Sequence, residues 1–446
     1  MTTININLRL LAQSLIFVMS FNVLLRSFFG SFYGLIELLF LSILFILSLL
    51  YYVDRKKYFE LDYAGYFYLS FIAYLIIHMI LAIITRSFEY DVHAYSFILV
   101  GLYEFKNSSI TFLFPLLYFF INNNNQEKFE YFLIFVLKIA IIYTIFEQVV
   151  SLLGYRDFFI TYMQGVIHEI HNPHSTRLGM YRPFGLIGSP HILGILHIIG
   201  VIYMFRYKQY KWAILGLLAV FISTSITAYG VMIAVIGLYL IYSKKYLWIV
   251  IGALLGTILM FIILNRLDYV LGMAHLDEYA DLSSFDLFTH QIYGYFLLIS
   301  NIIDPVSQKI SDAGPLSLII NYFSVNPQNI LFGKGMTYLM ELRHYDLVQI
   351  HNYGVFAEEF AVTSSDFYIL NFIEQFGALG FILLITVFFI IPIKKMNIYN
   401  VHHVLVLNAF LIATLHYSPA GFFILMMFVG YSVYSLYFKG KQKLNE

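Results

Sequence analysis

Almost uninterrupted apolar runs constrain this chain more than any other feature of its sequence. The residues from Leu38 to Val53 and from Phe381 to Ile393 are examples. Several runs reach or approach the roughly 20 residues that a helix needs to cross the hydrocarbon core of a bilayer. A helix also bonds every backbone N–H and C=O internally, as a medium without water requires. Because transmembrane barrels show short segments of alternating polarity instead, the runs predict an all-α polytopic membrane protein.

The runs divide the chain into about twelve predicted transmembrane helices. Hydrophobic residues make up 60% of the 446 and charged residues 12%, far outside the range of soluble domains. The segment 212–243 is short for two helices, but its basic flanks require an even number of crossings, and we expect its turn in the polar string from Ser223 to Thr227. The predicted spans are 9–28, 33–53, 63–85, 103–121, 129–152, 183–205, 212–226, 229–243, 246–265, 366–393, 400–416 and 419–438.

Basic side chains predict the orientation of the spans. Lys and Arg gather in the short cytoplasmic connections of membrane proteins. Here most of them fall on one side: Arg55, Lys56, Lys57, Lys128, Arg206, Lys208, Lys211, Lys244, Lys245, Lys394, Lys395, Lys439, Lys441 and Lys443. The sequence therefore predicts a multi-pass protein of the cytoplasmic (inner) membrane, with both termini in the cytoplasm.

Two long connections are predicted on the opposite side. An outer loop at 153–182 follows the fifth span, and a large extracytoplasmic loop at 266–365 lies between helices 9 and 10. We expect one integral membrane domain overall, with helices 1–9 in residues 1–265 and helices 10–12 in residues 366–446. The chain has no cysteine, so no disulfide supports these loops.

Arginine is the preferred cation of the predicted outer loops. Ten residues separate Arg177 from Gly188, and ten separate Arg343 from Gly354. A guanidinium binds phosphate oxygens bidentately and loses its hydration more easily than an ammonium. The alternative for each Arg is that it reaches lipid headgroups or pairs with a loop carboxylate. As a set, the outer arginines predict a phosphate-binding site formed by Arg177, Arg182, Arg266 and Arg343.

Three segments carry a family resemblance. The first runs from Arg177 to His191, the second from Ile330 to Thr337 with Arg343, His351 and Gly354 behind it, and the third from Ser365 to Phe381. Together they resemble the bacterial O-antigen and capsular polysaccharide polymerases of the Wzy type, in the O-antigen ligase/polymerase superfamily. The resemblance covers about half of the chain, from roughly 150 to 393, and it implies a glycosyltransferase architecture similar to the GT-C class.

The resemblance implies an inverting, metal-independent glycosyltransferase without cofactors. Such an enzyme joins oligosaccharide repeat units carried on undecaprenyl diphosphate at the outer face of the cytoplasmic membrane, in the biosynthesis of lipopolysaccharide, capsule or exopolysaccharide of the cell envelope. The implied partners are the lipid-linked oligosaccharides and the lipid bilayer. A chain-length regulator and a flippase are candidate protein partners, and no nucleic acid is involved.

The chemistry of this reaction suggests roles for the candidate residues. A diphosphate leaving group needs its negative charge stabilised, so we expect Arg177, Arg182 and Arg343 to clamp it, with Arg266 as a weaker fourth contact. The attacking hydroxyl needs a group that orients it or removes its proton. His351 is the candidate, and Glu358 or Glu359 is the alternative. Gly188 and Gly354 complete the two motifs.

Two other functions stay open at this point. A ligase of the same superfamily would share the donor site and differ only in its acceptor. A transporter or flippase of lipid-linked oligosaccharides would have similar length and hydropathy, but transporters usually show two similar halves. Here one large loop follows the ninth predicted span and the arginines gather at one face, which favours an enzyme.

Overall fold

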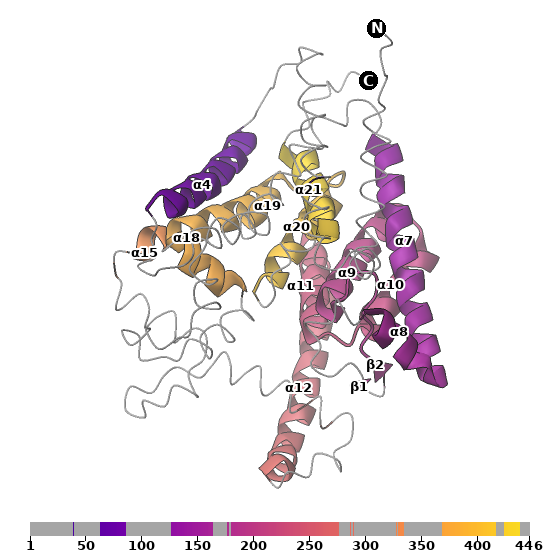
Figure 1. The fold of residues 1–446 in the computed structure, drawn as a ribbon. Helices are drawn as coiled ribbons and strands as arrows, with labels where there is room; N and C mark the ends of the chain where they lie inside the picture. Colours follow the sequence, from indigo (N-terminus) through magenta and orange to yellow (C-terminus); the bar gives the residue numbers. More distant parts are fainter. Residues whose placement is uncertain are drawn as a thin grey trace.

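A computed structural model of the chain describes Leu39 and residues 63–85, 126–163, 176–177, 180–275, 286, 289, 327, 329–333, 368–415 and 423–437. This part is helical apart from one hairpin of two short strands (Figure 1). Three of its helices are long and apolar enough to cross a membrane, at Glu130–Thr161, Tyr246–Arg266 and Gln375–Lys395. The predicted all-α class is therefore confirmed for the described part. The predicted spans 9–28 and 103–121, and all of 33–53 except Leu39, lie outside it.

The other predicted spans fall on described helices. The short segment 212–243 holds two helices, as predicted, and their turn lies at residues 223–225, where Thr224 has a positive φ of 49°. The main helices are α4 (Tyr63–Thr85), α7 (Gln126–Val150), α9 (Pro190–Arg206), α10 (Tyr210–Ile222), α11 (Ile226–Tyr242), α12 (Tyr246–His275), α18 (Tyr368–Ile385), α20 (Val401–Ala413) and α21 (Phe423–Tyr437).

Several predicted helix ends are wrong, each for a local reason. The fifth span does not stop at 152: a π-helical turn, η3 (Ser151–Tyr155), leads into α8 (Arg156–Met163) through a kink at Gly154. The sixth begins at Pro190 rather than 183, because Gly185 and Gly188 take positive φ angles that no α-helix contains. The ninth runs past 265 to His275, and α12 extends beyond the other described helices (Figure 1).

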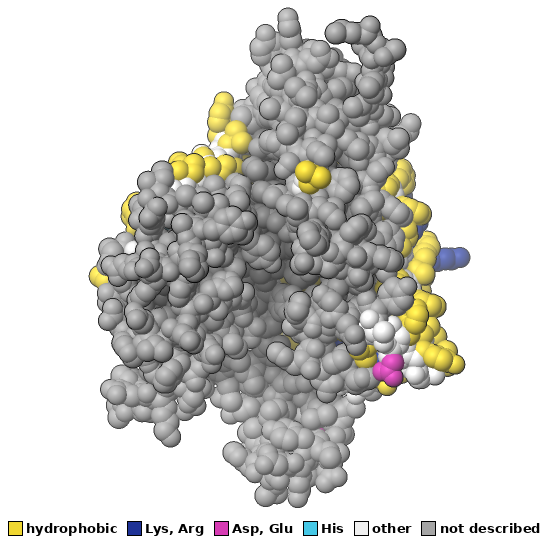
Figure 2. Space-filling model, in the orientation of Figure 1, with side chains coloured by type: hydrophobic (Ala, Val, Ile, Leu, Met, Phe, Trp, Pro, Cys, Tyr) yellow, Lys and Arg dark blue, Asp and Glu magenta, His cyan; other side chains and the backbone are white. Residues whose placement is uncertain are grey.

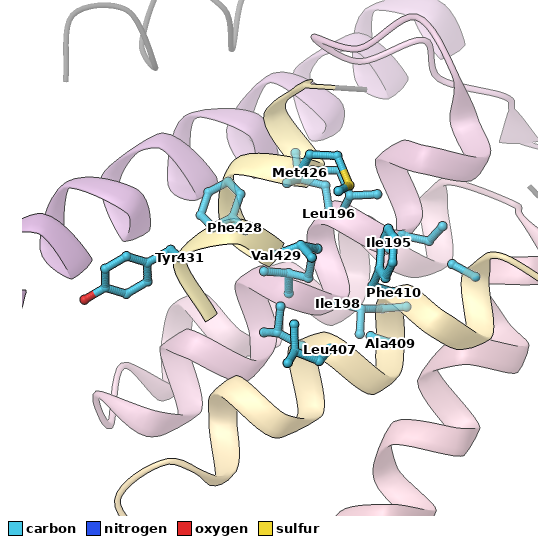
Figure 3. Packing of buried hydrophobic residues seen from close by; sticks show 14 of the residues in the cluster. Ile195, Leu196, Ile198, Leu407, Ala409, Phe410, Met426, Phe428, Val429 and Tyr431 are labelled. Carbon is cyan, nitrogen blue, oxygen red and sulfur yellow. The ribbon is translucent and has the colours of Figure 1, made fainter. Parts of the chain in front are cut away.

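The core lies where α9 meets α20 and α21. Nearly every residue of α9 is buried, as expected of a helix that is apolar on all sides. Figure 3 shows side chains of these three helices in contact: Ile195, Leu196 and Ile198 from α9, Leu407, Ala409 and Phe410 from α20, and Met426, Phe428 and Val429 from α21. Such packing holds α9 in place against α20 and α21.

The outer face of α7 exposes large apolar side chains at helical spacing: Tyr131, Phe135, Ile142, Phe146 and Val149. Figure 2 shows hydrophobic side chains along the edge of the molecule where α7 and α8 lie. Over residues 246–266 of α12, whose side chains the structure describes, most large apolar side chains are exposed as well. Soluble proteins rarely expose apolar patches of this extent. Such a surface is suited to contact with lipid, in agreement with helices that are long and apolar enough to cross a membrane.

The helix predicted over 366–393 is interrupted at Gly377. This residue has φ 65° and ψ −173°, a region that is essentially open to glycine alone. A Cβ there would lie 2.4 Å from the carbonyl oxygen of Leu331, at the short helix α15 (Asn329–Phe332), and a Cβ on Gly333 would lie 2.3 Å from the carbonyl oxygen of Gln375. Two of the segments that carry the resemblance therefore touch, backbone to backbone.

Gly377→Ala is expected to lower the free energy of unfolding by about 2–3 kcal/mol, because the methyl group meets a backbone that cannot move aside and the conformation is strained. Thermal unfolding of the purified protein in detergent measures the effect. Gly237→Ala in α11 is the matched control, since a Cβ there has nothing within 4 Å. Equal melting temperatures for the two variants would contradict the close approach of α15 and α18.

Candidate functional site

Arg182 directly follows a hairpin formed by β1 (Thr176–Arg177) and β2 (Met180–Tyr181). The strands are antiparallel, with Thr176 opposite Tyr181 and Arg177 opposite Met180. This register places the backbone of Arg177 across from a residue only two positions before Arg182. The hairpin thus brings the backbones of two of the predicted phosphate-binding arginines together.

A buried ion pair holds the chain at Arg182 and directly after it. Arg156 Nη1 donates to Glu147 Oε1 at 2.9 Å, and both side chains are almost completely buried. Arg156 Nη2 donates to the carbonyl oxygen of Arg182 at 2.6 Å, and its guanidinium lies over the ring of Phe184, 4.1 Å from the centroid. The backbone N–H groups of Phe184 and Gly185 each donate to Glu147, at 2.8 Å. We call Glu147 and Arg156 the brace.

A second set of hydrogen bonds orients the Arg182 side chain. Arg182 Nη2 lies 2.9 Å from Nε2 of His191, and Nδ1 of His191 lies 3.0 Å from Ser225 Oγ. A guanidinium can only donate, so Nε2 accepts and the ring proton is on Nδ1, which donates to Ser225. Ser225 also caps α11 by accepting from the backbone N–H of Ala228 at 3.2 Å. A neutral His191 therefore fixes the position of the guanidinium.

The start of α9 adds a partial positive charge beside these residues. Pro190 occupies the first turn, and the Ser189 side chain is buried without making the cap hydrogen bond. Helix N-termini favour anions through their dipole and their N–H groups. The two glycines do not contribute donors, because the N–H of Gly185 bonds Glu147 and that of Gly188 bonds the carbonyl oxygen of Phe184. Gly188 instead forms the turn that leads into α9.

The remaining predicted residues are not gathered with Arg182 in the described part. Arg266, on α12, makes a two-pronged ion pair with Asp286: Nε lies 2.7 Å from Oδ1 and Nη2 lies 3.3 Å from Oδ2. Pairing with a loop carboxylate is the alternative role of an outer arginine, and Arg266 has such a partner. Arg343, His351 and Gly354 lie outside the described residues, as do Glu358 and Glu359.

Sequence reasoning missed Arg156, His191 and Ser225 as parts of this site. Glu147 lies in an apolar span, where a carboxylate is costly in lipid, and its side chain is buried inside the bundle. Its partner was not foreseen. The sequence signal for this pair is weak: Arg156 follows Glu147 by nine residues, with Gly154 between them. The chain bends at Gly154, and the Arg156 side chain contacts Glu147.

One group of described residues has the donor set of a metal site. Glu130 of α7 and His402 and His403 of α20 are buried, and their candidate ligand atoms lie within 4.8 Å of one another. The group lies near the other end of α7, since Glu147 lies 17 positions further along the helix than Glu130, roughly 25 Å at 1.5 Å per residue. It is therefore separate from the site around Arg182.

No protein-family model matches this sequence, and a comparison with curated proteins also finds no match. The functional argument therefore depends on the geometry and chemistry of the described residues.

Proposed function

We propose that this chain is a polysaccharide polymerase, a membrane glycosyltransferase that joins oligosaccharide units carried on undecaprenyl diphosphate. The observation that carries the proposal is the fixed position of the Arg182 guanidinium. Its backbone is held by the brace, and its side chain is held by His191 beside the start of α9. An arginine fixed in this way beside a helix N-terminus suits a phosphate group rather than a mobile lipid headgroup.

The proposed reaction transfers the growing glycan from its lipid carrier to a new unit. A hydroxyl oxygen of the acceptor sugar attacks C1 of the donor sugar, with inversion, and the C1–O bond to the diphosphate breaks. The hydroxyl proton passes to a base, for which His351 is the candidate. The bonding electrons leave with the lipid diphosphate, whose charge Arg177, Arg182 and Arg343 stabilise. Arg266 is a weaker candidate, because Asp286 already binds it.

Purified protein in detergent, incubated with synthetic undecaprenyl-diphosphate oligosaccharide and no nucleotide or added metal, is expected to give a ladder of longer glycans on a gel. Vesicles that show transport of the lipid-linked sugar, with no ladder from the purified protein, would overturn the proposal in favour of a flippase. Transfer to a different acceptor, with no growth of the lipid-linked chain, would overturn it in favour of a ligase.

Arg177→Ala and Arg343→Ala are each expected to lower the rate of ladder formation by about 100-fold, because each removes one group that stabilises the leaving diphosphate. The rate is measured from the glycans formed at early times. Lys245→Ala, at an exposed position between α11 and α12, is the control and should leave the rate unchanged. Wild-type ladders in both arginine variants would contradict the diphosphate clamp.

A further inference from the structure

We propose that Glu130, His402 and His403 bind one divalent transition-metal cation of the zinc class. The site joins α7 to α20 near the end of the bundle that lies away from Arg182. Two imidazoles and a carboxylate are typical ligands of zinc and related ions, whereas magnesium and calcium prefer oxygen ligands alone. The proposal does not depend on the glycosyltransferase activity.

The separations of the ligand atoms fit an ion between them. Nε2 of His403 lies 3.8 Å from Oε1 of Glu130, too far for a charge-assisted hydrogen bond, which spans about 2.7–2.9 Å. Around a tetrahedral ion with metal bonds of about 2.0–2.2 Å, two ligand atoms lie roughly 3.3–3.6 Å apart, which is close to this separation. All the candidate ligand atoms of the group lie within 4.8 Å of one another, so rotation of the side chains brings them to this distance.

The surrounding residues orient the ligands as an outer shell does in metal sites. Nδ1 of His403 lies 3.4 Å from Ser432 Oγ of α21, which leaves Nε2 directed toward Glu130. Tyr431 donates to Oε1 of Glu130 at 2.9 Å, and the hydroxyl of Tyr207, just after α9, donates to Oε2. Each carboxylate oxygen has two lone pairs, so one remains on each oxygen after these bonds.

The charge balance of the group also favours a cation. The two tyrosine hydroxyls give Glu130 hydrogen bonds but no positive charge. Lys395 lies seven positions before His402 in the sequence, but its ammonium group has other contacts. It donates to the carbonyl oxygen of Leu436 and lies over the rings of Tyr63 and Tyr437. Among the described residues, the group within ion-pair distance of Glu130 is His403. A buried carboxylate is costly without a counter-charge, and a metal ion would supply it while cross-linking helices far apart in the sequence.

Metal binding by the full-length protein tests this proposal. Protein in detergent is freed of metal with a chelator, loaded with Zn²⁺, passed through a desalting column and assayed for retained zinc. We expect about one ion per chain, and a higher melting temperature with Zn²⁺ than with Mg²⁺. Loading with Co²⁺ should give a visible absorption band. A wild-type protein that retains no zinc would overturn the proposal.

Variants locate the site. His403→Asn and Glu130→Gln are expected to weaken zinc binding by more than about 100-fold, and Tyr207→Phe, which keeps every ligand, by about 10-fold. His78→Ala on α4 is the control and should bind as the wild type does. The Tyr207→Phe variant keeps the test decisive if a ligand variant fails to fold. Unchanged zinc affinity in the folded variants would overturn the assignment.

Discussion

Arg182→Ala is expected to reduce polymer formation by about 100-fold or more, with the fold retained. The brace bonds the backbone carbonyl of residue 182 and not its side chain, so the substitution leaves the surrounding chain in place. What is lost is a guanidinium that His191 fixes beside the start of α9. The rate of ladder formation from synthetic lipid-linked oligosaccharide measures the effect, and the melting temperature shows that the fold persists.

The conservative change separates charge from geometry at this position. Arg182→Lys keeps the positive charge but has no planar fork of donors, so it should remain impaired by at least about 10-fold. Arg206→Ala is the matched control, because it removes an arginine from the C-terminal end of α9, away from Arg182. If Arg182→Ala polymerises at the wild-type rate, Arg182 is not part of a phosphate site and the functional proposal loses its main support.

Glu147→Gln is expected to lower the free energy of unfolding by about 3–5 kcal/mol, because it leaves the Arg156 guanidinium buried without its counter-charge. It also weakens the bonds that hold the N–H groups of Phe184 and Gly185. The segment from Phe184 to the start of α9 should therefore become more mobile. Polymer formation should fall even at temperatures where the bundle stays folded. Thermal unfolding and ladder formation measure the two effects.

A double variant tests whether the brace acts as a pair. Glu147→Leu combined with Arg156→Leu removes both charges and should be more stable than Glu147→Gln, since no buried charge is left alone. Its polymer formation should still be reduced, because the backbone of Arg182, Phe184 and Gly185 loses these hydrogen-bond partners. Asp157→Asn, an exposed carboxylate next to Arg156, is the control, with an expected change within about 0.5 kcal/mol. Equal stability of Glu147→Gln and Asp157→Asn would rule out a structural brace.

The pairing of polar groups could not be predicted in the way that the helices were. Hydropathy located α4 and the pair α10 and α11, because a long apolar run has to be helical in lipid. It misplaced the start of α9, because Gly185, Gly188 and Pro190 decide locally where the helix begins. It also gave no sign that α18 breaks at Gly377, where a second backbone approaches from Leu331.

The sequence alone determined that this protein is built of apolar helices and that Arg177 and Arg182 lie close along the chain, since both follow from composition and spacing. Only the tertiary structure decided that Glu147 pairs with Arg156, that His191 holds Arg182, and that Glu130 meets His403. The physical reason is that a buried polar group takes whichever partner helix packing brings within about 3–4 Å. That partner lies at a sequence distance that no local pattern records.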